Sequence, residues 1–142
     1  MNGRMPRVCP GDSEDQKALR VFIVDDSAIV RARLTMILSE LPGVEVVGQS
    51  QVASEAIEGI RRLTPDVVVL DIRLAAGSGI DVLEAIKKDK KPPTVIMLTS
   101  YPYPQYRKRC AEAGAEYFLD KSTEFDRIPD IFRQLIQDCP VG

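Results

Sequence analysis

Short apolar runs alternate with amphipathic stretches along most of the chain. Residues 20–24 (RVFIV) form the first apolar run, and its short length predicts a buried strand. Apolar residues then recur at i, i+4, i+7, i+8 and i+11 from Val30, which predicts a helix that ends before Pro42 and Gly43. The same two patterns recur four more times. The further strands are expected at 44–48, 67–70, 94–98 and 116–119, and the further helices at 54–63, 80–88, 103–113 and around 128–136. Ser54 is the expected N-cap of the second helix, and Pro129 fits the first turn of the last one.

This alternation predicts an α/β fold. Continuous apolar strands separated by helices favour a parallel sheet that is covered on both faces. Right-handed crossovers leave few topologies, and we expect a doubly wound (βα)5 sheet of five strands in the order 2-1-3-4-5. Residues 1–17 mix proline, glycine and charge without periodicity, so a disordered N-terminal tail is expected there. Residues 18–138 are then one domain, and 139–142 a short C-terminal tail.

Composition narrows the classes of function. A hydrophobic content of 44% and a net charge of −2 are those of an ordinary globular protein, without a general charge argument for nucleic-acid binding. The sequence contains neither an apolar run of the roughly 20 residues that span a membrane nor a secretory signal, so a cytoplasmic protein with reduced thiols is expected. The chain also has no histidine, so any chemistry that needs an imidazole must come from a partner.

Polar side chains follow the apolar runs of four expected strands. Asp25 and Asp26 follow the first strand, Asp71 the third, Thr99 the fourth and Lys121 the fifth. In an open α/β sheet, ligands bind beyond the carboxyl ends of the strands, where the strand order reverses. Three carboxylates crowded there would repel one another, and Mg²⁺ would relieve that repulsion. A metal, a hydroxyl and an ammonium around one carboxylate would form a pocket for a phosphoryl group.

Each of these residues also has a simpler explanation when taken alone. Asp26 could cap the first helix, and Thr99 could cap the fourth helix. Asp71 could begin a turn. A lysine such as Lys121 is most often a solvated surface side chain. These explanations do not account for the joint placement at the strand ends, so we favour the functional interpretation.

The segments VDDS, VVVLDI, IMLTS and FLDKS, in this order and at these intervals, resemble the receiver domain of bacterial two-component response regulators, over about residues 19–138. The resemblance implies a flavodoxin-like fold in which Asp71 accepts a phosphoryl group from a phosphohistidine of a sensor histidine kinase or histidine phosphotransfer protein. It implies that Asp25, Asp26, Asp71 and the backbone carbonyl of Arg73 hold Mg²⁺. The missing histidine agrees with a donor supplied by another protein.

The resemblance also assigns roles around the phosphoryl group. Thr99 matches a hydroxyl that moves to bond it, Lys121 a lysine that pairs with it, and Phe118 an aromatic side chain that changes rotamer. Arg73 and Tyr101 lie two residues after Asp71 and Thr99, and flank the approach of water in this family. From their bulk we predict slow hydrolysis of the aspartyl phosphate.

Residues in the loops expected after Lys121 and Asp71 affect the conformation of those loops. Ser122 follows Lys121 where the family usually has proline, which removes the basis for a cis bond there. Ala75 stands where proline is common, which predicts a less rigid loop after Asp71. The glycines of that loop, Gly77 and Gly79, are interpreted as room for phosphate and a partner's histidine.

The expected output is protein–protein docking, without direct binding to nucleic acid or membrane. The fourth helix has a thin apolar stripe, so we predict that the face of the fourth helix, fifth strand and fifth helix binds a downstream protein or a second copy. Two other functions remain. The chain could be the regulatory half of a longer DNA-binding or enzymatic regulator, or a Mg²⁺-dependent flavodoxin-like phosphohydrolase. The latter usually has two acids two residues apart, whereas this chain has Asp71-Ile72-Arg73. We therefore expect that the protein is not an enzyme and catalyses only its own phosphorylation and dephosphorylation.

Overall fold

The computed structural model describes residues 18–138, so both expected tails lie outside the described residues. Within that range five strands alternate with five helices, as the apolar pattern predicts. No helix among the described residues is long and apolar enough to cross a membrane. The strands are β1 (Leu19–Val24), β2 (Val44–Ser50), β3 (Val67–Leu70), β4 (Thr94–Thr99) and β5 (Tyr117–Asp120). The helices are α1 (Ala28–Ser39), α2 (Ala53–Leu63), α3 (Gly79–Ile86), α4 (Pro104–Glu112) and α5 (Arg127–Gln137).

The strands form one parallel sheet in the order β2-β1-β3-β4-β5, which confirms the predicted doubly wound topology. The chain turns to one side of β1 to make β2 and then crosses to the other side to make β3, so the order reverses between β1 and β3. In the register of these two strands, Val24 lies opposite Leu70. The residues that follow, Asp25 and Asp71, therefore leave the sheet side by side.

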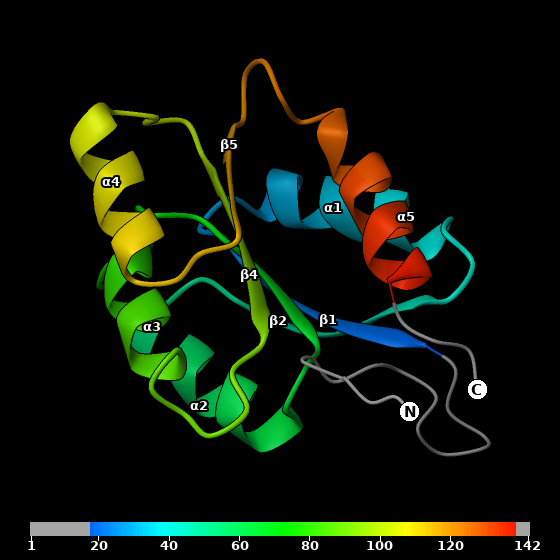
Figure 1. Cartoon of the computed structure of the whole chain (residues 1–142), viewed down its shortest axis with the longest axis horizontal. Coiled ribbons are helices and arrows are strands. Elements are labelled where there is room, and N and C mark those ends of the chain that lie inside the picture. Colours follow the sequence, from blue (N-terminus) through cyan, green and yellow to red (C-terminus); the bar gives the residue numbers. More distant parts are fainter. Residues whose placement is uncertain (1–17, 139–142) are drawn as a thin grey trace.

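Helices cover both faces of the sheet, with α1 and α5 on one face and α2, α3 and α4 on the other (Figure 1). Successive side chains of a strand point to opposite faces, so each strand contributes to two cores. In β1, Val21 and Ile23 pack in the core under α1 and α5, whereas Phe22 and Val24 pack in the core under α2 and α3. Burial on both faces explains why the strands are continuous apolar runs.

The start of α2 differs from the prediction. The helix begins at Ala53, so Ser54 lies inside it and is not the N-cap. Val52 occupies the cap position without a side-chain hydrogen bond, and the Ala53 N–H instead donates to the Ala76 carbonyl at 2.9 Å. The loop after β3 thus satisfies an amide that a capping side chain would otherwise satisfy.

The remaining predictions for the helices agree with the structure. Pro129 lies in the first turn of α5. Cys110 is the one fully buried side chain of α4 among the described residues, and Tyr106 and Ala113 are only partly buried against the core. The α4 helix is therefore weakly anchored to the sheet, as its thin apolar stripe predicts.

Candidate functional site

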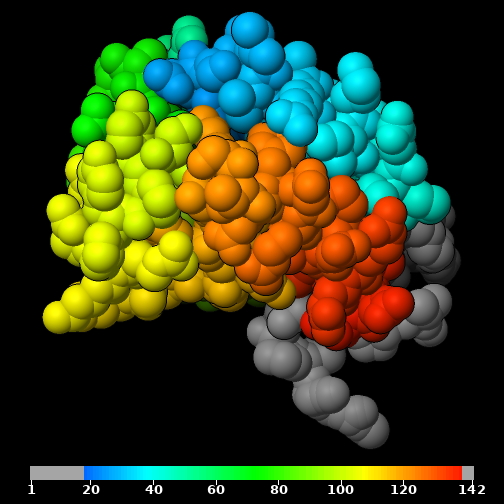
Figure 2. Space-filling model, turned by 90° about the horizontal axis from the view of Figure 1, so that it is seen from above, coloured from blue at the N-terminus to red at the C-terminus, as the bar shows by residue number. Residues whose placement is uncertain are grey.

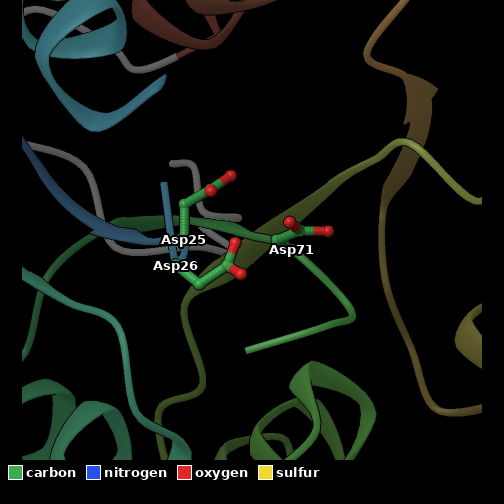
Figure 3. A group of neighbouring side chains, drawn as sticks. All are labelled: Asp25, Asp26 and Asp71. Carbon is green, nitrogen blue, oxygen red and sulfur yellow. The ribbon is translucent and has the colours of Figure 1, made fainter. Parts of the chain in front are cut away.

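Three carboxylates meet where the strand order reverses. Backbone hydrogen bonds hold two of them in the sheet, because the Asp25 N–H donates to the Ser50 carbonyl at 3.0 Å and the Asp71 N–H to the Val24 carbonyl at 2.9 Å. Asp25 and Asp71 are 2% and 4% exposed, and Asp26 is exposed. One oxygen from each of the three lies within 4.8 Å of the others. Figure 3 shows the three side chains gathered beyond the ends of β1 and β3.

Lys121 joins this group from the far edge of the sheet. Its Nζ lies 2.8 Å from Oδ2 of Asp25 and 2.9 Å from Oδ2 of Asp71. The Lys121 N–H also donates to the Thr99 carbonyl at 2.8 Å, which holds the end of β5 against the end of β4. The structure therefore brings together the acids and the lysine that the sequence places at separate strand ends.

The electrostatics of the crevice show an excess of negative charge. Burial raises the pKa of Asp71 above its ordinary value and Asp25 raises it further, although the hydrogen bond from Lys121 opposes them. Burial alone would lower the pKa of Lys121, but its hydrogen bonds to Asp25 and Asp71 outweigh burial and raise it. Lys121 is therefore a fixed cation that Asp25 and Asp71 share, in a crevice that holds three carboxylates.

The donor groups suit a hard divalent cation. Asp25 Oδ1 accepts the Ser27 N–H at 2.9 Å and Asp71 Oδ1 accepts the Ile72 N–H at 2.7 Å, so backbone amides orient both carboxylates. Carboxylate oxygens with access to water are the ligands that Mg²⁺ prefers in proteins. The acid cluster could therefore hold Mg²⁺.

Thr99 is the last residue of β4, and Phe118 lies on the neighbouring strand β5 opposite Met97. Thr99 is fully buried, and its Oγ1 accepts the Tyr101 N–H at 3.0 Å. Phe118 is partly buried against the core under α2, α3 and α4, and the guanidinium carbon of Arg107 lies 4.5 Å from its ring centre. Phe118 is thus held between the core and a side chain of α4.

Arg73 and Tyr101 are in direct contact. The guanidinium carbon of Arg73 lies 4.0 Å from the centre of the Tyr101 ring, a cation–π arrangement. Sequence reasoning places both residues beside the crevice but not against each other. The backbone of Arg73 pairs with that of Ser78 in an antiparallel bridge, which fixes the position from which its side chain extends.

Backbone hydrogen bonds hold the loop after Asp71 against the segment between β2 and α2. The Ala75 N–H donates to the Gln51 carbonyl at 2.9 Å, and the Ala76 carbonyl accepts from Ala53. These backbone hydrogen bonds connect the loop to the segment between β2 and α2, and the lower rigidity expected from Ala75 stays a prediction.

The glycines of this loop lie where a side chain would not fit. A Cβ on Gly79 would lie 1.8 Å from the Asp71 carbonyl oxygen, and one on Gly77, with φ +84°, 2.6 Å from the Ala53 Cβ. Both glycines permit close backbone packing, and Gly79 packs on Asp71 itself. Close packing is thus a sufficient reason for both glycines, and their role as room for phosphate stays a prediction.

Arg31 and Ser122 make contacts beside the site that the sequence analysis did not predict. Arg31 donates from Nη1 to the Asp25 carbonyl at 2.7 Å and so holds the end of β1. After Lys121, the Ser122 N–H and hydroxyl both donate to Asp120 Oδ1, at 2.9 and 2.7 Å, and lower the pKa of Asp120. No cis peptide bond occurs in residues 18–138, so a side-chain turn replaces the usual proline at Ser122.

Comparison with known proteins agrees with this geometry. The family model described as response regulator receiver domain matches residues 21–133. The response regulator domain of Thermotoga maritima CheB has a TM-score of 0.74 and 32% identity, over 87% of this chain and 99% of that one. The transcriptional regulatory protein YvfU of Bacillus subtilis is 33% identical over 84% of this chain and 60% of its own length.

The curated relatives are longer than this chain. The match covers 44% of the sensory transduction protein LytT of Bacillus cereus, at 32% identity over 78% of this chain. It covers 23% of protein-glutamate methylesterase/protein-glutamine glutaminase 1 of Rhizobium johnstonii, at 45% identity over 56% of this chain. In each case the shared part is the size of one domain. The chain therefore belongs to the receiver-domain family of response regulators, whose general function is to accept a phosphoryl group on an aspartate.

Proposed function

We propose that Asp71 is the phosphoacceptor and that a phosphohistidine of a sensor histidine kinase or histidine phosphotransfer protein is the donor. An oxygen of the Asp71 carboxylate attacks phosphorus, the N–P bond breaks, and its electron pair returns to the imidazole nitrogen of the partner. The observation that carries the proposal is the position of Asp71: buried, at the end of β3, with Asp25 and Lys121 beside it.

The surrounding residues position the groups and neutralise charge. Asp25, Asp26, Asp71 and the backbone carbonyl of Arg73 would hold Mg²⁺, which neutralises negative charge on the phosphoryl oxygens. Lys121 supplies a fixed positive charge beside Asp71. Such charge neutralisation and positioning provide most of the catalysis in phosphoryl transfer.

Output begins at Thr99 and Phe118. In the proposal the Thr99 hydroxyl leaves the Tyr101 N–H and bonds a phosphoryl oxygen, and Phe118 then turns into the space that Thr99 vacates. Arg107 on α4 contacts the Phe118 ring, so this rotation would reach α4. Arg73 and Tyr101 limit the access of water, which gives a long-lived phosphorylated state.

The proposed partner surface is the face of α4, β5 and α5. Because α4 is weakly anchored, a conformational change of this face should require little free energy. It would bind a downstream protein or form a homodimer, without direct contact to nucleic acid or membrane. The proposal includes a cytoplasmic location, for which the free, buried thiol of Cys110 is the supporting observation.

A second candidate is the regulatory part of a longer protein. The chain spans 23–60% of the length of the curated relatives described above, and their names include a transcriptional regulator and a methylesterase. In that case the same α4–β5–α5 face would contact an attached output domain. A third candidate, phosphohydrolysis of external substrates, has less support, because Arg73 rather than an acid lies two residues after Asp71.

Intact-mass measurement after incubation with acetyl phosphate and Mg²⁺ tests the proposal. We expect a mass gain of one phosphoryl group, which disappears in Asp71→Asn and in excess EDTA. Asp81→Asn is the matched control, because Asp81 is an exposed acid in the first turn of α3. No gain in the wild type, or a gain that survives Asp71→Asn, contradicts the proposal. Turnover of a phosphoester in excess over the protein would instead support phosphohydrolysis.

A further inference from the structure

A series of side chains in contact with one another leads away from the crevice, and its first ring belongs to Tyr101, whose backbone N–H donates to Thr99 Oγ1. It begins with the Arg73 guanidinium on the Tyr101 ring and continues along the segment YPYPQY, residues 101–106. The ring centres of Tyr101 and Tyr103 are 6.1 Å apart, and those of Tyr103 and Tyr106 are 5.6 Å apart. Tyr106 then packs against the core under α2, α3 and α4. The series therefore connects the residue two positions after Asp71 with α4.

This segment lies on the functional side of the molecule. In Figure 2 the yellow-green segment after β4 borders the blue start of α1 and the orange segment after β5. These are the elements that follow Asp25, Thr99 and Lys121. The segment between β4 and α4, which contains Tyr101 and Tyr103, therefore borders the segments that follow Asp25 and Lys121.

Arg73 is a cation without a carboxylate partner among the described residues. Its side chain is exposed, and the Tyr101 ring is the contact that holds the guanidinium. By contrast, Arg61 and Arg127 pair with Asp89 and Glu124, at 3.2 and 3.0 Å. The Arg73 guanidinium contacts an aromatic ring and pairs with no carboxylate among the described residues, so it is available to form an ion pair with a phosphoryl group.

Phosphorylation changes the charge of the crevice in a way that calls for such a cation. The three acids and Lys121 sum to a charge of −2, which Mg²⁺ neutralises. A phosphoryl group carries a charge of about −1.5 to −2 in place of the −1 of the Asp71 carboxylate. Lys121 is already shared by Asp25 and Asp71 and has no second charge to offer. The excess is therefore about half to one negative unit, which the single positive charge of Arg73 can balance.

We propose that Arg73 binds the phosphoryl group on Asp71 and leaves the Tyr101 ring, and that the released tyrosines carry this change to α4. The proposal rests on Asp71 as the phosphoacceptor. Arginine bonds phosphate oxygens with two parallel N–H groups, and such charge-assisted bonds are stronger than a cation–π contact at an exposed site. In the unphosphorylated protein Tyr101 competes for Arg73, so the ring opposes phosphoryl binding while it holds the guanidinium ready.

This competition predicts effects of opposite sign for the two side chains. The probe is beryllofluoride at saturating Mg²⁺, a noncovalent stand-in for the phosphoryl group, with its affinity measured by titration calorimetry. Arg73→Gln should weaken the affinity about tenfold or more, the range of a charge-assisted hydrogen bond. Tyr101→Leu should strengthen it about two- to fivefold, because the competing stack is lost. In the Arg73→Gln background, Tyr101→Leu should have no effect.

Two controls isolate the inference. Lys90→Gln removes an exposed cation from the loop before β4, at the opposite end of the sheet, and should leave the affinity unchanged. Thermal unfolding of each variant shows whether it remains folded. Asp71→Asn tests the phosphoacceptor itself: loss of the Mg²⁺-dependent binding there, with no change in Arg73→Gln, would overturn this inference and leave the proposed function standing.

The tyrosines provide a second readout. The chain has four tyrosines and no tryptophan, and three of the four belong to the series, so near-ultraviolet circular dichroism reports mainly on it. Beryllofluoride should change this signal in the wild type and change it much less in Arg73→Gln. An equal loss of affinity in Arg73→Gln and Tyr101→Leu would overturn the inference, because the pair would then act together as a cover.

Discussion

The ammonium of Lys121 lies 2.9 Å from Oδ2 of Asp71, although the two residues are 50 positions apart in the chain. The same ammonium lies 2.8 Å from Asp25, so one cation separates two buried carboxylates. Removal of one partner from a buried ionic group leaves uncompensated charge, which typically costs about 3–5 kcal/mol. The stability of the metal-free protein therefore depends on Lys121.

Lys121→Met should lower the free energy of unfolding in EDTA by about 3 kcal/mol, the usual cost of removing one partner from a buried ion pair. Saturating Mg²⁺ should restore much of the loss, because it supplies positive charge to the same carboxylates. Urea unfolding with and without Mg²⁺ measures both effects, with Lys90→Met as the exposed control. Equal destabilisation in both conditions would show that Lys121 contributes by packing.

Asp71→Asn should have the opposite effect on stability. Burial raises the pKa of Asp71 in the folded protein, so the folded state holds its proton more tightly than the unfolded state. Ionisation then disfavours folding once the pH rises above the unfolded value of 3.8, and the full penalty is present above the folded pKa. In EDTA at neutral pH, Asp71→Asn should therefore unfold at higher temperature than the wild type.

The difference between Asp71→Asn and the wild type should shrink as the pH falls toward 4, because the wild-type carboxyl then becomes neutral. Thermal unfolding across this pH range is the measurement. A variant that is less stable than the wild type at neutral pH would show that the hydrogen bond from Lys121 outweighs burial.

Gly79→Ala should displace the backbone that carries Asp71. The added Cβ would lie 1.8 Å from the Asp71 carbonyl oxygen, so either the end of β3 or the start of α3 must move. We expect a loss of at least about 3 kcal/mol, in the range of severe overpacking, together with weaker phosphorylation by acetyl phosphate. Ser78→Ala removes the neighbouring N-cap of α3 and should cost only about 1 kcal/mol. Similar losses for both variants would contradict the steric explanation.

The fold and the ends of its strands could be predicted because they depend on local patterns. Short continuous apolar runs and a 3.6-residue spacing define the elements, and parallel strands bring Asp25, Asp71 and Lys121 to one edge. The Ser54 cap could not be judged locally, because a carbonyl from a distant loop satisfies the amide of Ala53. The stack of Arg73 on Tyr101 was missed for the same reason: it joins side chains of two loops, and no sequence spacing encodes their directions.

Hydrolysis of the aspartyl phosphate should be faster in Arg73→Ala than in the wild type. We expect the Arg73 side chain to cover one approach to the phosphoryl group that it binds, and truncation would open that approach to water. We expect an increase of a few-fold or more in the rate at which labelled phosphoryl is lost after removal of the donor. Lys90→Ala is the control for loss of a cation at the far end of the sheet. Faster loss from the wild type than from Arg73→Ala would contradict a protective role.

Phosphorylation should change amide exchange in α4 and β5 more than in α1 or α2. The α4 helix buries Cys110 alone, and Arg107 connects it to Phe118, so a small free-energy change at the crevice is enough to alter its opening. Hydrogen exchange with and without beryllofluoride and Mg²⁺ makes the comparison. Arg107→Gln is expected to reduce the change in α4 without preventing beryllofluoride binding, because Arg107 contacts the Phe118 ring and not the carboxylates. Unchanged exchange across residues 104–120 on binding would remove the basis for an output surface there. An unaltered response in Arg107→Gln would assign the coupling to another contact, and the contact between the Tyr103 and Tyr106 rings is the alternative route.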